Sequence, residues 1–441
     1  MNGSIARPTA TGFPVQNGSA GLENDKTELP SDVGPPDGGR EAWLTVAGAC
    51  LVQFTTFGYI NAFGVYQDFY TREFLTNKSA SAISWIGSLQ LFLQYAPGIL
   101  VGKAFDAGYF HHTMISGSIL YVFSMFMVSL TRKNQYTEVI LSQGIGMGIG
   151  LGLLFLPSLS IISHYFRARR ALAIGIVTSG GSLGGIIFPI MLNKISQYTS
   201  FANATRATAA LVALLLFLAN LAMKPRYSQI RAKPAAPRDA LRTIFTDGAY
   251  TASLLAAFCT NLGIFFPFFY LQLYAIGHNI NPQVAFFILA MLNAGSSLGR
   301  VLASFLAGYF GVYNLLILCL VISASLSFSL LRITSLAGII AFSVVYGFTS
   351  GAYVSLIPAL LGQLSSHVGE LGLRMGAAFS VVAVAMLIGV PIDGALLTHD
   401  GERLIWSRSI VFCSTMIMAG SMFMMLSRLL FIRTRQRGQL V

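Results

Sequence analysis

Two charged side chains stand inside long uncharged stretches of this 441-residue sequence. Arg300 follows 52 uncharged residues, 248–299, and Asp393 follows 18, 375–392. A guanidinium in apolar surroundings can hold an anion through two parallel hydrogen bonds, and a carboxylate there can take up and release a proton. Arg300 is therefore a candidate for binding an anion, and Asp393 is a candidate for proton coupling.

A third position combines charge with a helix end. Lys103 and Asp106 close an apolar stretch in the segment Gly102-Lys-Ala-Phe-Asp106-Ala-Gly108. A carboxylate there can cap the start of a neighbouring helix, because the free N–H groups and the helix dipole favour negative charge. The two residues are candidates for a gate between helices, and the alternative is that they are plain surface charges.

Residues for metal binding or nucleophilic catalysis are not grouped in this sequence. Its six histidines are scattered without an i, i+4 pair, its four cysteines form no CxxC motif, and no Ser/His/Asp arrangement fits a catalytic site. The alternating glycines from Gly144 to Gly152 lie inside an apolar stretch, so they indicate close helix packing and not a nucleotide loop. We expect no metal, no cofactor and no enzymatic activity.

The composition identifies the elements that must position these side chains. Hydrophobic residues make up 54% of the chain and charged residues only 10%, against about 25% in soluble domains. So few charges could not cover the surface of a soluble protein of this length. The sequence therefore predicts an all-α polytopic membrane protein, with the lipid bilayer as its surroundings.

Charged residues divide the chain into stretches of one helix length. A helix needs about 20 residues to cross the apolar core of a bilayer. The 52-residue stretch before Arg300 must hold two helices, with a break at Gly277-His-Asn-Ile-Asn-Pro282. Twelve transmembrane helices are expected, near 42–66, 82–104, 113–131, 137–164, 170–191, 201–223, 249–276, 283–307, 311–331, 335–362, 373–397 and 404–430.

The basic residues orient these helices. An even number of helices puts both termini on one side, and if that side is cytoplasmic, 19 of the 28 Lys and Arg lie in the tail and inner loops. This bias predicts cytoplasmic termini. The expected location is the plasma membrane, and a vacuolar or other internal membrane is the alternative. It also explains the net charge of +12 without nucleic-acid binding. Asn77, in the sequon Asn77-Lys78-Ser79 of the first outer loop, is a candidate for glycosylation.

The two halves of the chain repeat with an offset near 202. Pro157 precedes Pro358 by 201 residues, Pro189 precedes Pro391 by 202, and Arg170 precedes Arg374 by 204. Two similar halves predict two six-helix pseudo-repeats around one central site. The expected parts are a disordered cytoplasmic tail (1–36), an N-terminal half (37–223), a basic cytoplasmic linker (224–247), a C-terminal half (248–432) and a short basic tail (433–441).

Two motifs resemble a known family. The first helix opens with Pro35-Pro-Asp37-Gly38-Gly39-Arg-Glu-Ala42-Trp43, and the fifth opens with His164-Tyr-Phe-Arg-Ala-Arg-Arg170-Ala-Leu-Ala-Ile-Gly175. Together they resemble the two signatures of the monocarboxylate porter family of the major facilitator superfamily, in the form of its fungal branch. The resemblance implies the major facilitator fold and transport by alternating access.

The sequence departs from the animal carriers of that family at two positions. These carriers use a Lys in the first helix and an Asp four residues before an Arg in the eighth; here Asn61 and Ser296 stand at those positions, and only Arg300 is kept. The resemblance therefore does not imply animal-type proton–lactate symport. Arg300 and Asn61 are candidate substrate-binding residues, as are Tyr270 and Tyr274, which follow a proline in an aromatic run.

Each of these interpretations has a plain alternative. Arg300 lies about 7 residues, roughly 10 Å, from the expected inner end of its helix at 307, so it could extend to the membrane surface. Asp393 could be a surface charge at an outer helix end, and the aromatic run at 265–270 could face lipid.

These observations together indicate a transporter of a small organic molecule, which is anionic if Arg300 binds it. The fungal resemblance favours efflux of a secondary metabolite by a monomer, with the proton as the candidate coupling ion. The alternatives are uptake of a monocarboxylate or riboflavin-like solute, and a non-transporting nutrient receptor.

Overall fold

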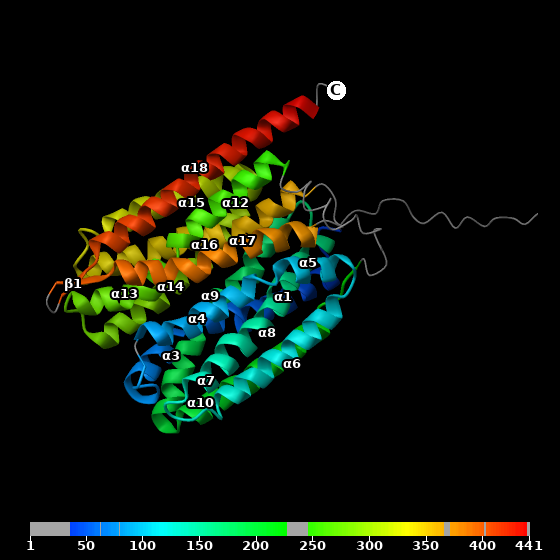
Figure 1. The fold of residues 1–441 in the computed structure, drawn as a ribbon. Helices are drawn as coiled ribbons and strands as arrows, with labels where there is room; N and C mark the ends of the chain where they lie inside the picture. Colours follow the sequence, from blue (N-terminus) through cyan, green and yellow to red (C-terminus); the bar gives the residue numbers. More distant parts are fainter. Residues whose placement is uncertain are drawn as a thin grey trace, which may run out of the picture. The chain divides into compact units, whose positions relative to one another are not determined.

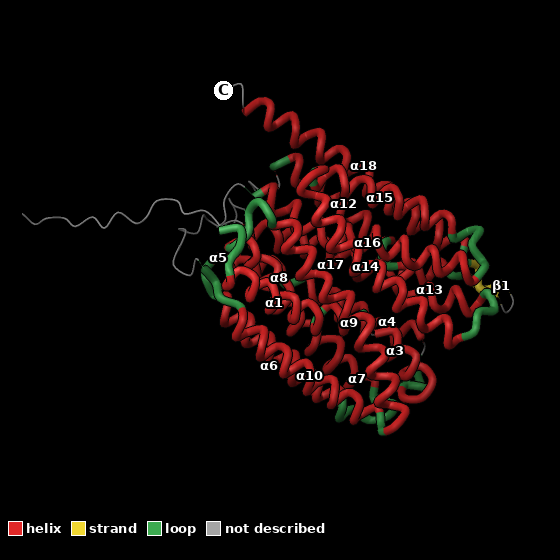
Figure 2. The backbone as a smooth tube through the Cα atoms, turned by 180° about the vertical axis from the view of Figure 1, so that it is seen from behind, coloured by secondary structure: helices red, strands yellow, loops and turns green. Residues whose placement is uncertain are grey.

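The computed structural model describes residues 36–61, 63–78, 80–226, 246–365, 371–400 and 403–438. Most of these residues are helical, and the described strands are one antiparallel hairpin of β1 (Thr398–Asp400) and β2 (Arg403–Ile405) (Figure 2). The expected N-terminal tail up to residue 35, the expected linker from 227 to 245 and residues 439–441 lie outside the described residues.

The N-terminal half forms six helical segments, several of them built from short helices that continue one another (Figure 1). The elements are α1 (Arg40–Thr55), α2 (Phe57–Ile60), α3 (Phe63–Phe69) and the π-helix η1 (Tyr70–Phe74); α4 (Ala80–Tyr95) and α5 (Gly98–Asp106); α6 (Phe110–Val128); α7 (Tyr136–Val139), the π-helix η2 (Ile140–Met147), α8 (Gly148–Ser160) and the 3-10 helix η3 (Ile161–His164); α9 (Arg170–Tyr198); and α10 (Phe201–Ala222).

The C-terminal half also forms six segments in its described part, and its first segment is again divided. The elements are α12 (Gly248–Gly263) and α13 (Phe266–Gly277); α14 (Pro282–Phe310); α15 (Val312–Ser329); α16 (Leu336–Leu364); α17 (Leu371–Leu396); and α18 (Ser407–Gly438).

Ten segments of the described chain are long and apolar enough to cross a membrane by themselves. The other two are the expected second and third helices. The second is divided at Pro97 into α4 and α5, since proline cannot supply a backbone N–H to a continuous helix. The third, α6, opens with His111 and His112, which make its first turn polar. With these two segments, the described residues contain the twelve helical segments that the sequence predicts.

Local sequence signals set several helix boundaries. The predicted break at 277–282 is confirmed, because α13 ends at Gly277 and α14 begins at Pro282. Asn279 adopts a φ of 64° in this turn, and the side chain of Asn281 caps α14 by accepting a hydrogen bond from the backbone of Gln283 at 2.9 Å. Proline at the first position needs no N–H donor, so this Asn-Pro pair suits a helix start.

The internal repeat is visible in the positions of prolines inside helices. Pro157 lies inside α8 and Pro358 inside α16, while Pro189 lies inside α9 and Pro391 inside α17. These pairs are the fourth and tenth segments and the fifth and eleventh segments. The chain therefore consists of two six-helix pseudo-repeats, as the sequence predicts.

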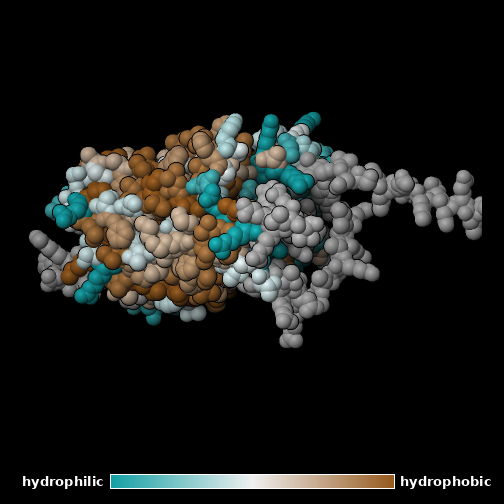
Figure 3. Space-filling model, turned by 90° about the horizontal axis from the view of Figure 1, so that it is seen from above, coloured by the Kyte–Doolittle hydropathy of each residue, from teal (hydrophilic) through white to brown (hydrophobic). Residues whose placement is uncertain are grey.

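The two halves meet in two regions. On one side α9 packs against α14 and α16, and on the other α4 and α5 pack against α17. Figure 3 shows a broad apolar surface on the visible face, with hydrophilic side chains near the ends. Large apolar side chains such as Leu100, Ile119 and Phe217 are exposed, which is typical of helices in contact with lipid.

Candidate functional site

A cavity lies between the two halves. Its free volume is about 40 Å³, which is room for a few water molecules and far below the 300 Å³ or more of ordinary ligand pockets. A small organic ligand can therefore enter only when the halves separate. The lining comes from Gln53, Phe57, Tyr95, Phe155, Leu159 and Thr178 in the first half and from Asn261, Phe265, Arg300, Tyr353, Val354, Ile357, Pro358, Phe379, Val382 and Met386 in the second.

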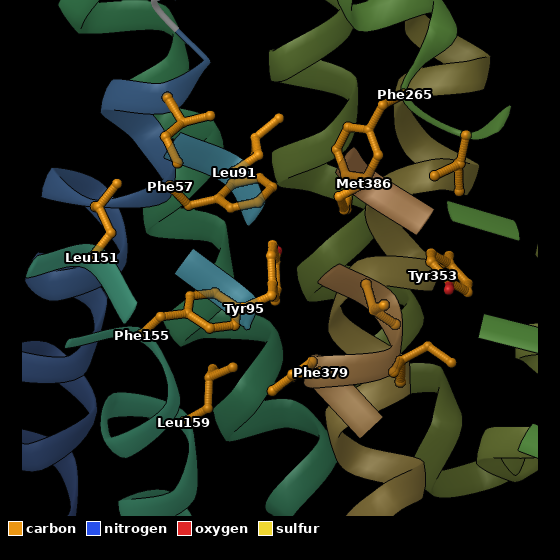
Figure 4. Packing of buried hydrophobic residues seen from close by; sticks show 14 of the residues in the cluster. Phe57, Leu91, Tyr95, Leu151, Phe155, Leu159, Phe265, Tyr353, Phe379 and Met386 are labelled. Atoms are coloured by element: carbon orange, nitrogen blue, oxygen red, sulfur yellow. The ribbon is translucent and has the colours of Figure 1, made fainter. Parts of the chain in front are cut away.

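Aromatic rings close this cavity on the side where α17 begins. The ring centroids of Tyr95 and Phe155 are 4.9 Å apart, and those of Tyr95 and Phe379 are 5.6 Å apart. Figure 4 shows Phe57 and Leu91 opposite Phe265 and Met386, with the three rings farther along the same space. Because Phe379 belongs to the second half and the other two rings to the first, this closure joins both halves.

Arg300 carries a positive charge into the cavity wall. It lies on α14, and its side chain is 2% exposed. One terminal nitrogen donates to the backbone carbonyl of Thr178 on α9 at 2.5 Å, and Nε donates to Ser296 Oγ at 3.3 Å. The guanidinium also lies 5.2 Å from the ring centroid of Phe57. Within the described part of the chain, no carboxylate forms an ion pair with Arg300.

The depth of Arg300 excludes the surface position considered above. Helix α14 continues to Phe310, ten residues beyond Arg300, which corresponds to about 15 Å. The sequence-based estimate of the helix end, 307, was too short. The guanidinium points across to Thr178 on the other half instead of along its own helix.

Asn61 and Ser296 lie at the interface of α9, α14 and the end of α2. The Asn61 side-chain amide donates to Asn293 Oδ1 at 3.5 Å, and Ser182 Oγ donates to Ser296 Oγ at 3.0 Å. Asn61 therefore contacts the other half at a position outside the lining of this closed cavity, and its role in substrate binding stays a prediction. Ser182 and Asn293 are not evident from the sequence, because it does not show which face of each helix meets the other half.

Two amide side chains provide polar groups in the cavity. Gln53 donates to Ser158 Oγ at 3.0 Å, and Asn261 donates to the Tyr353 hydroxyl at 2.8 Å. The sequence alone does not single out these residues, because uncharged polar side chains are common in apolar helices. One signal could have found them: Gln53 and Phe57 are followed 208 residues later by Asn261 and Phe265.

Tyr270 and Tyr274 lie outside the cavity lining, although Phe265 of the same aromatic run contributes to it. The Tyr274 hydroxyl lies 2.6 Å from the backbone carbonyl oxygen of Leu330 and 2.8 Å from that of Ile333, and its single proton can be donated to either, so it holds the connection between α15 and α16. The Tyr270 hydroxyl donates to the carbonyl of Val390 on α17 at 3.3 Å. The contact of these two tyrosines with the substrate stays a prediction.

Asp106 joins the two halves at the end of α5. Its carboxylate accepts hydrogen bonds from the backbone N–H of Gly372 at 3.0 Å and of Leu373 at 2.8 Å, at the start of α17. This is the helix cap that the sequence suggested, and it excludes a plain surface charge. Lys103, one turn earlier, adds no hydrogen bond to this contact in the described structure. We refer to the region of Asp106, Arg170 and Gly372 as the inner end.

Glycines bring α5 and α17 together beside Asp106. Gly98 packs against Gly376 and Gly102 against Gly372, with a spacing of four residues on both helices. A Cβ atom added to Gly98 would lie 2.7 Å from the carbonyl oxygen of Gly376, and one added to Gly102 would lie still closer to that of Gly372. The two backbones are therefore in direct contact across the halves, as in small-residue helix pairs of membranes.

Arg170 makes a second contact between the halves at the inner end. One of its terminal nitrogens donates to the carbonyl of Gly362, in the last turn of α16, at 2.6 Å. Its counterpart in the repeat, Arg374, donates to the carbonyl of Leu364 at 2.8 Å and forms an ion pair with Asp247 at 3.3 Å. A positive charge suits the negative end of the dipole of α16.

Asp37 connects the two signature segments of the sequence. Its Oδ1 atom accepts hydrogen bonds from the backbone N–H of Arg167 at 2.6 Å, Ala168 at 2.8 Å and Arg169 at 3.3 Å, and its own N–H donates to the carbonyl of Tyr165 at 2.9 Å. The acidic residue of the first segment therefore holds the turn at 167–169 that leads into α9, within the second segment.

The two remaining predicted residues lie in different environments. Asn77 is exposed in the turn after η1, where its side chain donates to the carbonyl of Asn134 at 3.3 Å. Asp393 lies inside α17 and is 1% exposed, so it is not a surface charge at a helix end.

Comparison with known proteins identifies the family. The family model described as Major Facilitator Superfamily matches residues 43–312. The chain is 41% identical to the aspyridones efflux protein of Emericella nidulans over 83% of this chain and 74% of that protein. It is 36% identical to the fujikurins efflux protein of Gibberella fujikuroi over 92% of this chain and 86% of that protein. It is 35% identical to an MFS transporter of Aspergillus flavus over 93% of this chain and 92% of that protein.

Solved structures share the fold. A Major Facilitator Superfamily transporter, FucP, in the outward conformation superposes with a TM-score of 0.67 at 16% identity, covering 88% of this chain and 99% of that chain. A second structure of FucP, the fucose:proton symporter of E. coli, gives a TM-score of 0.65 at 15% identity, covering 88% and 98%. At these identities the likeness establishes the arrangement of helices only.

Proposed function

Because the chain belongs to the Major Facilitator Superfamily and is therefore a membrane transporter, we propose that it exports an acidic secondary metabolite from a fungal cell. The observation that carries the acidic character is Arg300, a buried guanidinium that lines the cavity between the halves without a carboxylate partner in the described structure. Export is supported by the relatives that are named as efflux proteins for aspyridones and fujikurins.

The surroundings of Arg300 favour an anion over a neutral substrate. A buried charge without a partner is costly, and the two polar contacts of Arg300, to Thr178 and Ser296, are both uncharged. An anion that enters the cavity would supply the negative charge that Arg300 lacks as a partner. It can also accept two parallel hydrogen bonds from the planar guanidinium group. The walls are mainly aromatic and aliphatic, so they suit the apolar body of an organic acid.

We also propose membership in the fungal branch of the monocarboxylate porter family. The hydrogen bonds from the turn before α9 to Asp37 support this assignment, because they give a physical reason for two distant signature segments to occur together. The loss of the acidic residue at Ser296 separates the chain from animal-type proton–lactate symport.

Export to the medium requires a transporter in the plasma membrane, and we propose that location for this protein. We also propose that the inner end and both termini face the cytoplasm. The bias of Lys and Arg supports this orientation. We propose a monomer composed of the halves 37–223 and 248–432, joined by the linker 224–247, in which both halves contribute to the cavity lining. Asn77 would then face outside, where glycosylation is possible, and the proton is the proposed coupling ion.

The Asp106 contact should act as the latch of the closed inner end. In Asp106→Asn the side chain can still accept one hydrogen bond, but it loses its charge at the start of α17, worth about 0.3–2 kcal/mol. We expect transport to slow by about two- to thirtyfold at unchanged membrane abundance. Lys103→Gln is the matched control and should transport normally. If Asp106→Asn transported at the wild-type rate at equal surface abundance, the Asp106 contact would not be the latch of the closed inner end.

Deletion of the gene in its host tests the proposed function. Mass spectrometry of mycelium and medium should show one acidic metabolite whose ratio of cell-bound to secreted material rises severalfold in the deletion strain. Restoring the gene should return the ratio to its original value. An unchanged distribution of every acidic metabolite would contradict export, and retention of a neutral metabolite alone would contradict the acidic substrate.

A further inference from the structure

One carboxyl group is buried in the C-terminal half without hydrogen bonds to its side chain. Asp393 is 1% exposed, and neither of its carboxyl oxygens has a hydrogen-bond partner. Its backbone carbonyl is satisfied, since Ser409 Oγ donates to it at 2.8 Å. Burying an ionised carboxylate in this way is very costly, and such residues within membrane helices mark functional sites by default.

The surroundings of Asp393 offer no described positive charge. Tyr270 on α13, Tyr346 on α16 and Cys413 on α18 are the titratable groups within electrostatic reach. Helix α12 packs against the same stretch of α17 through Leu262, which contacts Gly389 and is uncharged. Arg408, in the first turn of α18, is exposed. None of these neighbours carries a positive charge that could balance an ionised carboxylate at Asp393.

Asp393 lies on the same helix as a residue that lines the cavity. It lies seven residues, or two helical turns and about 10 Å, beyond Met386, so both residues share one face of α17. Met386 lines the cavity. Pro391 lies between them and leaves one carbonyl of α17 without its usual donor, which permits local bending. A movement of α17 can therefore change the access of water to Asp393.

We propose that Asp393 is the proton-binding residue that couples export to proton entry. The carboxylate takes up one proton from the outer side while the halves are open outward, and the neutral carboxyl group is then buried as in this structure. When the inner end opens, water reaches Asp393 and the proton leaves to the cytoplasm, with no other bond formed or broken. The coupling rests on the proposed export function, but the binding of the proton by Asp393 does not.

The first test uses the proton alone. Infrared spectra of the purified full-length protein at neutral pH should contain a C=O band of a protonated carboxyl group, which shifts in heavy water. Asp393→Asn should lose this band. Asp106→Asn should keep it, because the carboxylate that this change removes accepts two hydrogen bonds in the wild-type protein and should be ionised. Asparagine has nearly the shape of a protonated aspartate, so the variant should unfold at the wild-type temperature. The same band in Asp393→Asn would overturn the proposal.

The second test measures coupling. Inside-out vesicles with an acidic interior should accumulate the metabolite retained by the deletion strain, about tenfold more per pH unit if one proton moves per molecule. Asp393→Asn should still exchange the metabolite but show no dependence on the pH gradient. The coupling role would be overturned if accumulation by Asp393→Asn followed the pH gradient. It would also be overturned if accumulation by the wild type did not follow it. If the wild type moves no metabolite at all, the proposed function fails, and the infrared test alone decides whether Asp393 binds the proton.

Discussion

Replacing Arg300 with glutamine should nearly abolish export of the acidic metabolite. The guanidinium is buried in the cavity wall and has only uncharged partners, so it is free to pair with an anion. Truncating one partner of a buried charge pair costs about 2–5 kcal/mol, which corresponds to thirtyfold or more in affinity. The measurement is initial efflux, normalised to protein at the cell surface.

A graded series separates charge from geometry. Arg300→Lys keeps the charge but loses the flat fork and the stacking on Phe57, so we expect an intermediate loss of about tenfold. Arg332→Gln removes an exposed arginine and is the matched control, with no expected effect. If Arg300→Gln exported at the wild-type rate, the anion-binding role would be wrong. If Arg300→Lys and Arg300→Gln lost equal activity at equal folding, the substrate would be neutral.

Replacing Gly102 with leucine should trap the transporter with its inner end open. The closed state places the backbones of α5 and α17 in contact at Gly102 and Gly372, and no side chain fits between them. The open state does not need this contact, so the variant should fold but transport at a small fraction of the wild-type rate. This is a steric block of one half of the cycle, and its effect should exceed that of Asp106→Asn.

The control is a helix glycine with open space around it. Gly308 lies in the last turns of α14, and a Cβ atom added there meets nothing within 4 Å. Gly308→Leu should therefore transport normally. The inner end can be probed by the labelling rate of a cysteine introduced at Ser380, whose hydroxyl contacts the backbone of Ala96. Gly102→Leu should increase that rate, and unchanged labelling with normal transport would contradict the closure described for α5 and α17.

The sequence predicted the fold well because each of its signals is local. Charged residues mark the ends of apolar stretches, the turn at 277–282 breaks a stretch that is too long for one helix, and the proline pairs show the repeat. The depth of Arg300 and Asp393 was also accessible, since a single charge in an apolar stretch is conspicuous.

The cavity lining could not be predicted in the same way. Tyr270 and Tyr274 lie on the helix that begins beside Phe265, but their hydroxyls bind backbone carbonyls of α17 and of the connection after α15. Gln53 and Asn261 are far apart in sequence and meet one cavity only because the halves pack with pseudo-symmetry. The face that a helix presents to its neighbours depends on this packing, which no local pattern contains.

Efflux by the purified protein tests the central claim most directly. Liposomes that contain the protein are loaded with the metabolite retained by the deletion strain, and its release is followed with time. We predict that the wild-type protein empties the liposomes and that Arg300→Gln retains the metabolite as well as protein-free liposomes do. Two results would contradict export of an acid through the cavity at Arg300. One is that liposomes with the wild-type protein release the metabolite no faster than protein-free liposomes. The other is that the wild type and Arg300→Gln release it equally fast.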